Sequence, residues 1–134
     1  MEELRVAAIA SLAPLEDLDA DPFAVDTRGQ QAVCARWAAD RGYVVTQQLL
    51  VYGMRADHCG FWYEVDAGRV DLFVAASDRV LGRALSCVEE FAAECDRRGV
   101  RLETAGEEEP RYTPAMKAEV HRRLSMPTAG YDGT

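Results

Sequence analysis

Three polar side chains follow apolar runs of this 134-residue chain, at points where chemistry is common. Ser11 ends the run RVAAIAS, and Asp78 and Arg83 lie shortly after the run VDLFVAA. Ligands of open α/β sheets bind at the carboxyl ends of the strands. A hydroxyl, a carboxylate and a guanidinium at that edge could bind a small phosphorylated ligand, because cationic groups stabilise phosphate charge.

Four stretches have the pattern of strands. Residues 4–13 and 70–76 are almost continuously apolar, which is typical of strands covered on both faces of a parallel sheet. Residues 43–51 predict another strand, which Gly53 ends, and residues 100–102 begin a fourth. We expect an α/β fold of three layers, with a mainly parallel four- or five-stranded sheet and helices on both faces.

One two-sided helix is expected between the strands at 70–76 and 100–102. Ser77 or Asp78 would cap its first turn, and Gly99 would end it. The three elements form a βαβ unit, whose crossover should be right-handed. The core-facing stripe of this helix recurs at three- and four-residue steps and comprises Leu81, Ala84, Leu85, Val88, Ala92 and Cys95.

An earlier helix is expected to start at Thr27. Thr27 and Gln30 have the T-x-x-Q spacing of a capping box, and the helix would end at Gly42. Residues 14–27 contain two prolines and five acidic residues, and they predict a loop. The buried face of this helix would consist of Val33, Cys34, Trp37 and Ala38.

A final helix is expected after an acidic linker. Thr113 would cap this helix and Pro114 would open it. Residues 1–126 would then form a single domain, and residues 127–134 a flexible tail. The apolar face of the last helix would consist of Met116, Val120 and Leu124.

The composition argues against several classes of protein. The net charge of -8 counts against nucleic-acid binding by the chain alone, because phosphate affinity comes mostly from Lys and Arg. No apolar run is as long as a membrane span, and the acidic start MEELRV lacks the basic region of a signal peptide. We therefore expect a cytoplasmic protein. A single lysine, a single isoleucine and the absence of asparagine indicate a GC-rich bacterial genome.

Metal chemistry is not expected. His58 and Cys59 are adjacent, so their side chains diverge, and no second pair of ligands accompanies them. The four cysteines lack CxxC spacing. We expect no cofactor, and we expect Cys34, Cys87 and Cys95 to be buried, reduced thiols.

Three segments match the pattern of a known family. They are QQAVCARWAADRGYVV, AGRVDLFVAASDRVLGRAL, and Gly-Val-Arg-Leu at residues 99–102. In this order and spacing they resemble the catalytic domain of the serine recombinases, the resolvase and invertase family. The resemblance spans residues 4–102, about three quarters of the chain. The matching positions are Gln30, Cys34, Trp37, Ala38, Arg41, Gly42, Tyr43, Gly68, Arg69, Asp71, Leu81, Gly82 and Arg83.

The resemblance implies a nucleophile that this chain lacks. In the family, the first strand ends in Tyr-x-Arg-x-Ser, and the serine attacks a DNA phosphodiester. In this chain, Ile9 stands at the tyrosine position, Ser11 at the arginine position and Ala13 at the serine position. Ser11 lies two residues from the position of the nucleophile, on the same side of the strand, and is a poor substitute for it.

The phosphate-binding residues are also degenerate. The family's Asp-Arg pair falls on Arg79 and Val80, and only Arg83 remains of the arginines around the scissile phosphate. Shifting the alignment by one residue would place the pair on Asp78 and Arg79. It would also move Gly82 and Arg83 out of their matching positions. Phosphoryl transfer needs cationic groups and a nucleophile held in line, so the resemblance implies the fold without the activity. We expect the family's long dimerisation helix and its DNA-binding domain to be missing from this chain.

We therefore expect a catalytically inactive, truncated serine-recombinase-like domain that acts as a protein-interaction or regulatory module. It would form a homodimer or bind another protein. Aromatic residues are enriched in interface cores, although those near Trp62 could equally dock a short helix on the sheet. The candidate interface residues are Phe61, Trp62, Tyr63, Met116, Val120 and Leu124.

Two alternatives remain open. The domain could be an accessory, DNA-associated partner of an active recombinase, for which six arginines would have to form one surface. It could instead be a repurposed α/β domain that binds a small phosphorylated ligand through Ser11, Asp78, Arg83 or the acidic loop at residues 14–27. DNA binding at low salt tests the first alternative, and stabilisation by ligands tests the second. The six arginines are Arg79, Arg83, Arg97, Arg98, Arg122 and Arg123.

Overall fold

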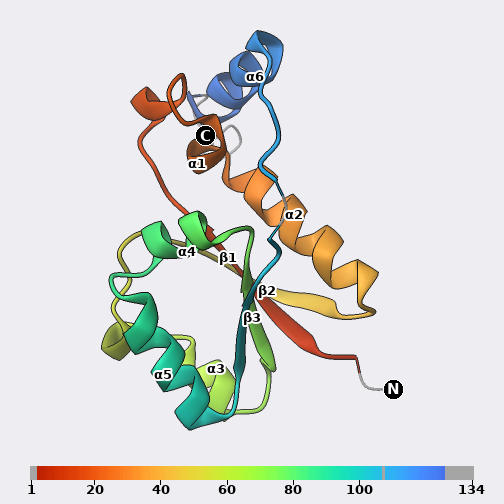
Figure 1. Cartoon of the computed structure of the whole chain (residues 1–134), viewed down its shortest axis with the longest axis vertical. Helices are drawn as coiled ribbons and strands as arrows, with labels where there is room; N and C mark the ends of the chain where they lie inside the picture. Colours follow the sequence, from red (N-terminus) through yellow and green to blue (C-terminus); the bar gives the residue numbers. More distant parts are fainter. Residues whose placement is uncertain (1–2, 107, 126–134) are drawn as a thin grey trace, which may run out of the picture.

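Four parallel strands form one sheet in the computed structural model of the chain, which describes residues 3–106 and 108–125 (Figure 1). The order across the sheet is β2-β1-β3-β4, and all three pairings are parallel. The expected α/β class with a mainly parallel sheet is therefore confirmed. The strands are β1 (Arg5–Ser11), β2 (Val44–Val51), β3 (Leu72–Ala75) and β4 (Arg101–Thr104).

The position of each strand explains its sequence. β1 lies between β2 and β3, and every residue of β1 after Arg5 is buried. All four residues of β3 are buried as well. β2 forms one edge of the sheet, and along it exposed residues alternate with less exposed ones. Continuous apolar sequence therefore marks the two central strands, which are covered on both faces.

Helices cover both faces of the sheet (Figure 1). α2 (Thr27–Asp40) lies on one face, where Cys34 and Trp37 belong to a buried cluster with Val6 and Ala8 of β1. These contacts confirm the buried side expected for this helix. On the other face lie α3 (Trp62–Asp66), α4 (Asp78–Ala84) and α5 (Val88–Arg98).

Three aromatic rings hold the second face together. Phe91 of α5 stacks on Trp62 of α3, with ring centroids 4.9 Å apart, and meets Phe73 of β3 edge-on at 5.3 Å. Phe73 and Phe91 are completely buried. Aromatic pairs in this arrangement contribute about 0.5–1.5 kcal/mol beyond the area that they bury. The cluster fixes α3 and α5 on the sheet.

The prediction of a single helix after β3 is wrong, because the chain forms two helices there, α4 and α5. Leu85, between them, has an extended backbone with φ -112° and ψ 143°. Met54 pairs with this break: its N–H donates to the carbonyl of Ala84 at 2.8 Å, and its carbonyl accepts from Ser86 at 2.9 Å. A distant segment thus satisfies backbone groups that a continuous helix would use internally, and this pairing overrides local propensity.

The two outer ends of α4 and α5 are as expected. The hydroxyl of Ser77 accepts a hydrogen bond from the N–H of Val80 at 3.2 Å, which caps α4. Gly99 ends α5 with a φ of 75°, a conformation that glycine adopts without the steric cost of a Cβ atom. These signals are local, so the sequence alone identified them.

The start of α2 differs from the expected capping box. Asp26, not Thr27, is the N-cap, and its carboxylate accepts from the N–H of Gly29 at 3.0 Å. Gln30 is fully buried and does not reach back to the cap. The stretch before α2, expected to be a loop, contains the 3-10 turn η1 (Leu15–Asp17) and the short helix α1 (Pro22–Val25).

α6 (Pro114–Ser125) lies beside α1 at one end of the molecule (Figure 1). The hydroxyl of Thr113 accepts from the N–H of Met116 at 3.1 Å, which confirms the expected cap. Val120 belongs to a small buried cluster with Leu18 and Val25. Through this cluster, α6 is held on the segment that follows β1.

The tail expected at residues 127–134 lies outside the described residues. A last 3-10 turn, η2 (Ala56–His58), precedes α3. Within residues 3–106 and 108–125, none of the helices has the length and apolar character needed to cross a membrane.

Candidate functional site

Ser11 lies at the carboxyl end of β1 and is completely buried. Its N–H donates to Oε1 of Gln30 at 2.7 Å, and its hydroxyl lies 3.5 Å from the same oxygen. The amide nitrogen of Gln30 donates to the carbonyls of Phe23 at 2.8 Å and Ala24 at 3.1 Å. Gln30 therefore ties β1 to α1, and the hydroxyl of Ser11 has no access to a substrate.

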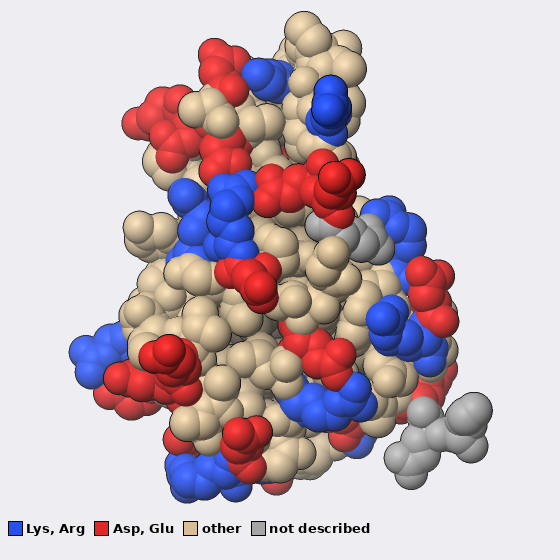
Figure 2. All heavy atoms as spheres, viewed as in Figure 1, with Lys and Arg blue, Asp and Glu red and all other residues tan. Residues whose placement is uncertain are grey.

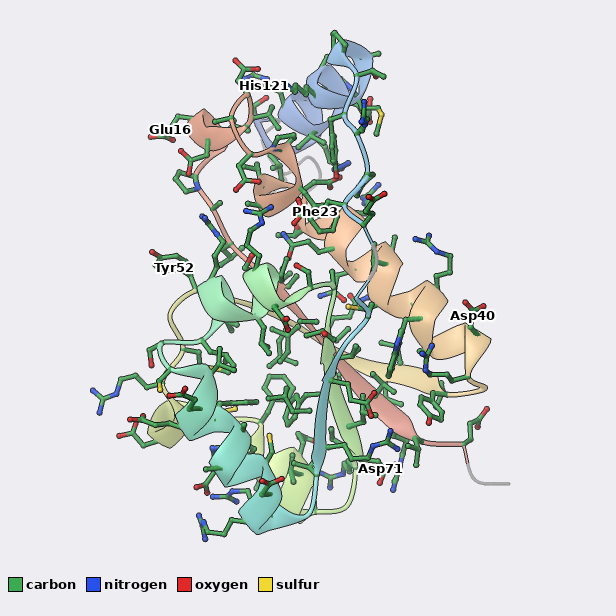
Figure 3. All side chains as sticks on the ribbon, in the orientation of Figure 1. Glu16, Phe23, Asp40, Tyr52, Asp71 and His121 are labelled. Atoms are coloured by element: carbon green, nitrogen blue, oxygen red, sulfur yellow. The ribbon has the colours of Figure 1, made fainter. Side chains whose placement is uncertain are left out.

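Ala13 lies farther out, where the structure brings it together with Arg83. Both residues line a surface pocket of about 410 Å³ beside α4. Nε of Arg83 is buried and has no hydrogen-bond partner among the described residues. Tyr52 also lines this pocket and projects outward beside α4 (Figure 3). The other lining residues are Leu12, Pro14 and Asp17.

Arg79, in the first turn of α4, is held by two carboxylates. Its Nη2 lies 3.0 Å from Oδ1 of Asp21 and 2.7 Å from Oε1 of Glu109, and further hydrogen bonds join the same groups. The hydrogen bond from Arg79 lowers the pKa of Asp21, and the two carboxylates raise the pKa of Arg79. Asp21 and Arg79 therefore stay charged at neutral pH, and the guanidinium of Arg79 faces two carboxylates.

Figure 2 shows the surface consequence of such pairing: basic and acidic side chains are interleaved over this face, with no separate basic patch. A patch that binds a nucleic acid backbone needs uncompensated lysine or arginine charge. On the face shown, acidic side chains border most of the basic groups.

Asp26 is the centre of a second polar cluster. Although only 8% exposed, it accepts hydrogen bonds from Tyr112 at 2.7 Å and from Arg123 at 2.8 Å, besides capping α2 at Gly29. Burial, and then the hydrogen bond to Asp26, raise the pKa of Tyr112. This cluster joins the start of α2 to the linker and to α6. Aspartate before a helix is a recognised capping signal, and it could have located Asp26 from the sequence.

The remaining candidate site residues take separate positions. Ser77 is the cap of α4, Asp78 is exposed in its first turn, and Val80 is buried in the core. Of the expected catalytic positions, Ala13 and Arg83 share a pocket. The sequence could not identify the partners of Arg79, because Asp21 and Glu109 lie in acidic stretches whose other acidic residues are equally eligible by type.

The candidate interface residues do not form one surface. Trp62 and Val120 are buried in the chain's own core, and Phe61 is half-buried. Tyr63 is 69% exposed on α3, whereas Met116 and Leu124, at 38% and 45%, lie on α6. α3 and α6 are at opposite ends of the molecule (Figure 1).

The thiols are partly as expected. Cys34 and Cys95 are buried, and burial raises the pKa of each to about 12. Cys87 was expected to be buried but is half-buried, because it precedes α5 instead of lying within a long helix. Cys59 is buried, and burial raises its pKa. No group of three or more potential metal ligands occurs within the described residues.

The chain has the fold of a serine recombinase catalytic domain. It is similar to the crystal structure of the C-terminal catalytic domain of ISC1926 TnpA, an IS607-like serine recombinase, with a TM-score of 0.58. The match covers 96% of this chain and 86% of that chain, at 19% sequence identity. No protein-family model matches the sequence, and no curated protein matches it significantly. The likeness confirms the fold that the sequence motifs predicted.

Proposed function

We propose that this chain is a catalytically inactive serine-recombinase-like domain that acts as a protein-interaction or regulatory module. The observation that carries the proposal is that the groups needed for catalysis are replaced or engaged at the carboxyl edge of the sheet. Alanine stands at the nucleophile position of the resembled family, at Ala13. The guanidinium of Arg79 is held by Asp21 and Glu109, which are part of the same chain.

The buried serine supports the loss of activity. For Ser11 to attack a phosphodiester, it would have to leave Gln30 and reach the surface. Its N–H would then lose a buried hydrogen bond of 2.7 Å. Leaving a buried donor unsatisfied costs about 1–3 kcal/mol, before any catalytic geometry is formed.

The ion pairs argue against the DNA-associated alternative. Arg97 pairs with Glu94, and Arg98 pairs with Glu94 and Asp66. Arg122 and Arg123 on α6 pair with Glu119 and Asp26. Five of the six arginines therefore have carboxylate partners, Arg79 included, and they lie on three different helices. A chain with a net charge of -8 gains little phosphate affinity from such residues.

A covalent trapping experiment tests the loss of activity. A 5′-labelled pool of random-sequence duplex DNA offers short targets without knowledge of a site. After incubation and denaturation, we expect no protein-linked DNA from the wild type, Ser11→Ala or Ser125→Ala. A linked product that only Ser11→Ala abolishes would show an active enzyme and refute the proposal. An active serine recombinase with its own site serves as the positive control.

Sedimentation over a range of concentrations tests the interaction role. We expect species heavier than the 14.8 kDa chain, either alone or with a partner identified by crosslinking in cells. A 14.8 kDa species at every concentration, together with no crosslinked partner, would contradict an interaction module.

A second candidate function rests on the pocket that Arg83 lines. Arg83 lines this pocket, and its positive charge there favours an anionic small ligand. A ligand at 100 times its Kd should raise the unfolding free energy by about 2.7 kcal/mol. Thermal unfolding with nucleotides and sugar phosphates, for the wild type and Arg83→Met, measures this. Stabilisation of the wild type alone would support the candidate, and none for either protein would exclude these ligands.

A further inference from the structure

The two edges of the sheet are unequal. β4 has four residues, and its Arg101 and Glu103 form an ion pair. β2 has eight residues, and residues 42–54 around it contain no charged side chain. Proteins usually protect an edge strand by keeping it short or by placing charges or proline on it, since an open edge invites another strand. β4 has that protection, whereas β2 is long and has neither a charge nor a proline, and its register is irregular only at Thr46.

The backbone of β2 has free groups on its outer side. The carbonyl of Val51 faces β1, because it accepts from the N–H of Leu12 at 3.1 Å. Successive residues of a strand point their backbone groups to alternate sides, so Leu49 also faces β1 while Gln48 and Leu50 face outward. Among the described residues, β2 pairs only with β1. One irregularity, at Thr46, precedes this regular segment.

Exposed apolar side chains accompany this edge. Leu50 is 53% exposed and Tyr52 is 68% exposed, at alternate positions along the chain. Leu12, which is hydrogen-bonded to Val51, is 42% exposed. Leu50 therefore lies on the strand whose outer backbone groups are free, and Tyr52 and Leu12 extend the exposed apolar surface toward the carboxyl end of the sheet. Exposed apolar surfaces of this kind mark interaction sites.

We infer that β2 pairs with β2 of a second copy of this chain, antiparallel and about a two-fold axis, to make one continuous eight-stranded sheet. This arrangement is isologous: the outward groups of Gln48 and Leu50 in each copy bond those of the other. The inference rests on the proposed interaction role and names its partner.

The distribution of charge favours a second copy as the occupant. Each chain has a net charge of -8, so two copies repel except where charge is absent, and β2 is such a place. The arginines that flank the strand are engaged within their own copy. Arg41 lies over the ring of Trp37 at 4.3 Å, and Arg55 pairs with Asp57 at 2.9 Å. Arg55 therefore presents no uncompensated charge to its symmetry mate, and Arg41 is held against its own helix although its charge has no carboxylate partner among the residues described.

The test compares matched variants by sedimentation, at chain concentrations from about 1 to 200 µM, a range that detects micromolar affinity. The wild type should approach twice the 14.8 kDa of one chain. Leu50→Lys places a charge on the edge and should weaken dimerisation at least about tenfold. Leu124→Lys makes the same change at an exposed leucine on α6 and should leave the dimer intact.

Two further readouts are specific to this arrangement. Amide hydrogen exchange at Gln48 and Leu50 of the wild type should slow as concentration rises, which requires no variant to fold. Raising the ionic strength from about 0.05 M to about 0.5 M should strengthen the dimer, because salt screens repulsion between the two acidic chains. A dimer held by ion pairs would weaken instead.

A wild type that stays monomeric, a Leu50→Lys variant as dimeric as the wild type, or dissociation by Leu124→Lys would overturn the inference. Its failure is separable from that of the proposed function. A dimer that forms covalent DNA products would refute inactivity and leave the β2 interface standing. A monomer that is inactive and binds a different protein would refute the β2 interface and leave the proposed function standing.

Discussion

Arg79 donates to both carboxylate oxygens of Asp21, a residue 58 positions away, with Nη2 and Oδ1 3.0 Å apart. The pair joins the segment after β1 to the first turn of α4, across the carboxyl edge of the sheet. In a phosphoryl-transfer enzyme, guanidinium groups at such an edge stabilise the reacting phosphate. Here the guanidinium of Arg79 stabilises the chain's own loop, with Glu109 as a second partner.

Releasing Arg79 should create weak anion binding. Asp21→Asn combined with Glu109→Gln removes both partners, so Arg79 becomes available to phosphate. We expect low-salt affinity for a single-stranded oligonucleotide to rise several-fold, measured by fluorescence anisotropy. Glu89→Gln with Glu90→Gln changes the net charge equally at exposed positions of α5 and should have a smaller effect. Equal gains in both double variants would mean that the change in net charge, and not the release of Arg79, raises the affinity.

The same ion pair predicts a dependence of stability on acid. Arg79 holds the pKa of Asp21 below its ordinary value, so the pair stabilises the fold above the unfolded pKa and loses this effect as pH falls through the folded pKa. Asp21→Asn should cost about 1 kcal/mol or less near pH 7, since the pair is partly exposed, and less than that near pH 3. Urea unfolding at both pH values measures this, and an equal cost at both would contradict it.

Gln30 should be the most costly polar residue to remove. Gln30→Ala leaves the N–H of Ser11 and the carbonyls of Phe23 and Ala24 without their partner, in a fully buried place. We expect a loss of roughly 2–4 kcal/mol in unfolding free energy, because each unsatisfied buried group costs about 1–3 kcal/mol. Gln31→Ala is the matched control. Gln31 is partly buried, its two bonds are 3.3 Å long, and its Oε1 has no hydrogen-bond partner among the residues described. A smaller loss for Gln30→Ala than for Gln31→Ala would contradict the role assigned to Gln30.

Gly29 should tolerate no side chain. A Cβ atom there would lie 2.6 Å from Oδ2 of Asp26 and 2.9 Å from the hydroxyl of Tyr112. Gly29→Ala should therefore separate the α2 cap from Tyr112 and cost about 1–3 kcal/mol, the usual range for overpacking. Gly82→Ala in α4 meets nothing within 4 Å and should be neutral or stabilise by up to about 1 kcal/mol. Thermal unfolding compares the stabilities of the two variants. Equal stability would show that Asp26 and Tyr112 can move to accommodate the added Cβ atom at little cost.

The cysteines should differ in reactivity. Thiolates are the reactive species, and burial raises the pKa of Cys34 and of Cys95 to about 12. We expect Ellman's reagent to modify Cys87 first, since it is the half-buried one, and the other three only on unfolding. Cys87→Ser should remove the rapid phase. Rapid modification of more than one thiol in the native chain would contradict the burial of Cys34, Cys59 and Cys95.

The sequence by itself determined the parts of this protein that depend on local signals. Long apolar runs identified β1 and β3, because a strand covered on both faces must be apolar at every position. Ser77, Thr113 and Gly99 marked helix ends, since capping requires only a few neighbouring residues. The motifs on these elements then identified the fold that the structure confirms.

Only the tertiary structure decided how distant residues meet. Met54 interrupts a helical pattern at Leu85, which no local periodicity reveals. Gln30 has the spacing of a capping residue, yet packing turns it toward Ser11. Arg79 could have remained free for phosphate, and its partners are 58 and 30 positions away. Ion pairs depend on which loops the fold brings together, and many acidic residues of this chain were equally eligible by type.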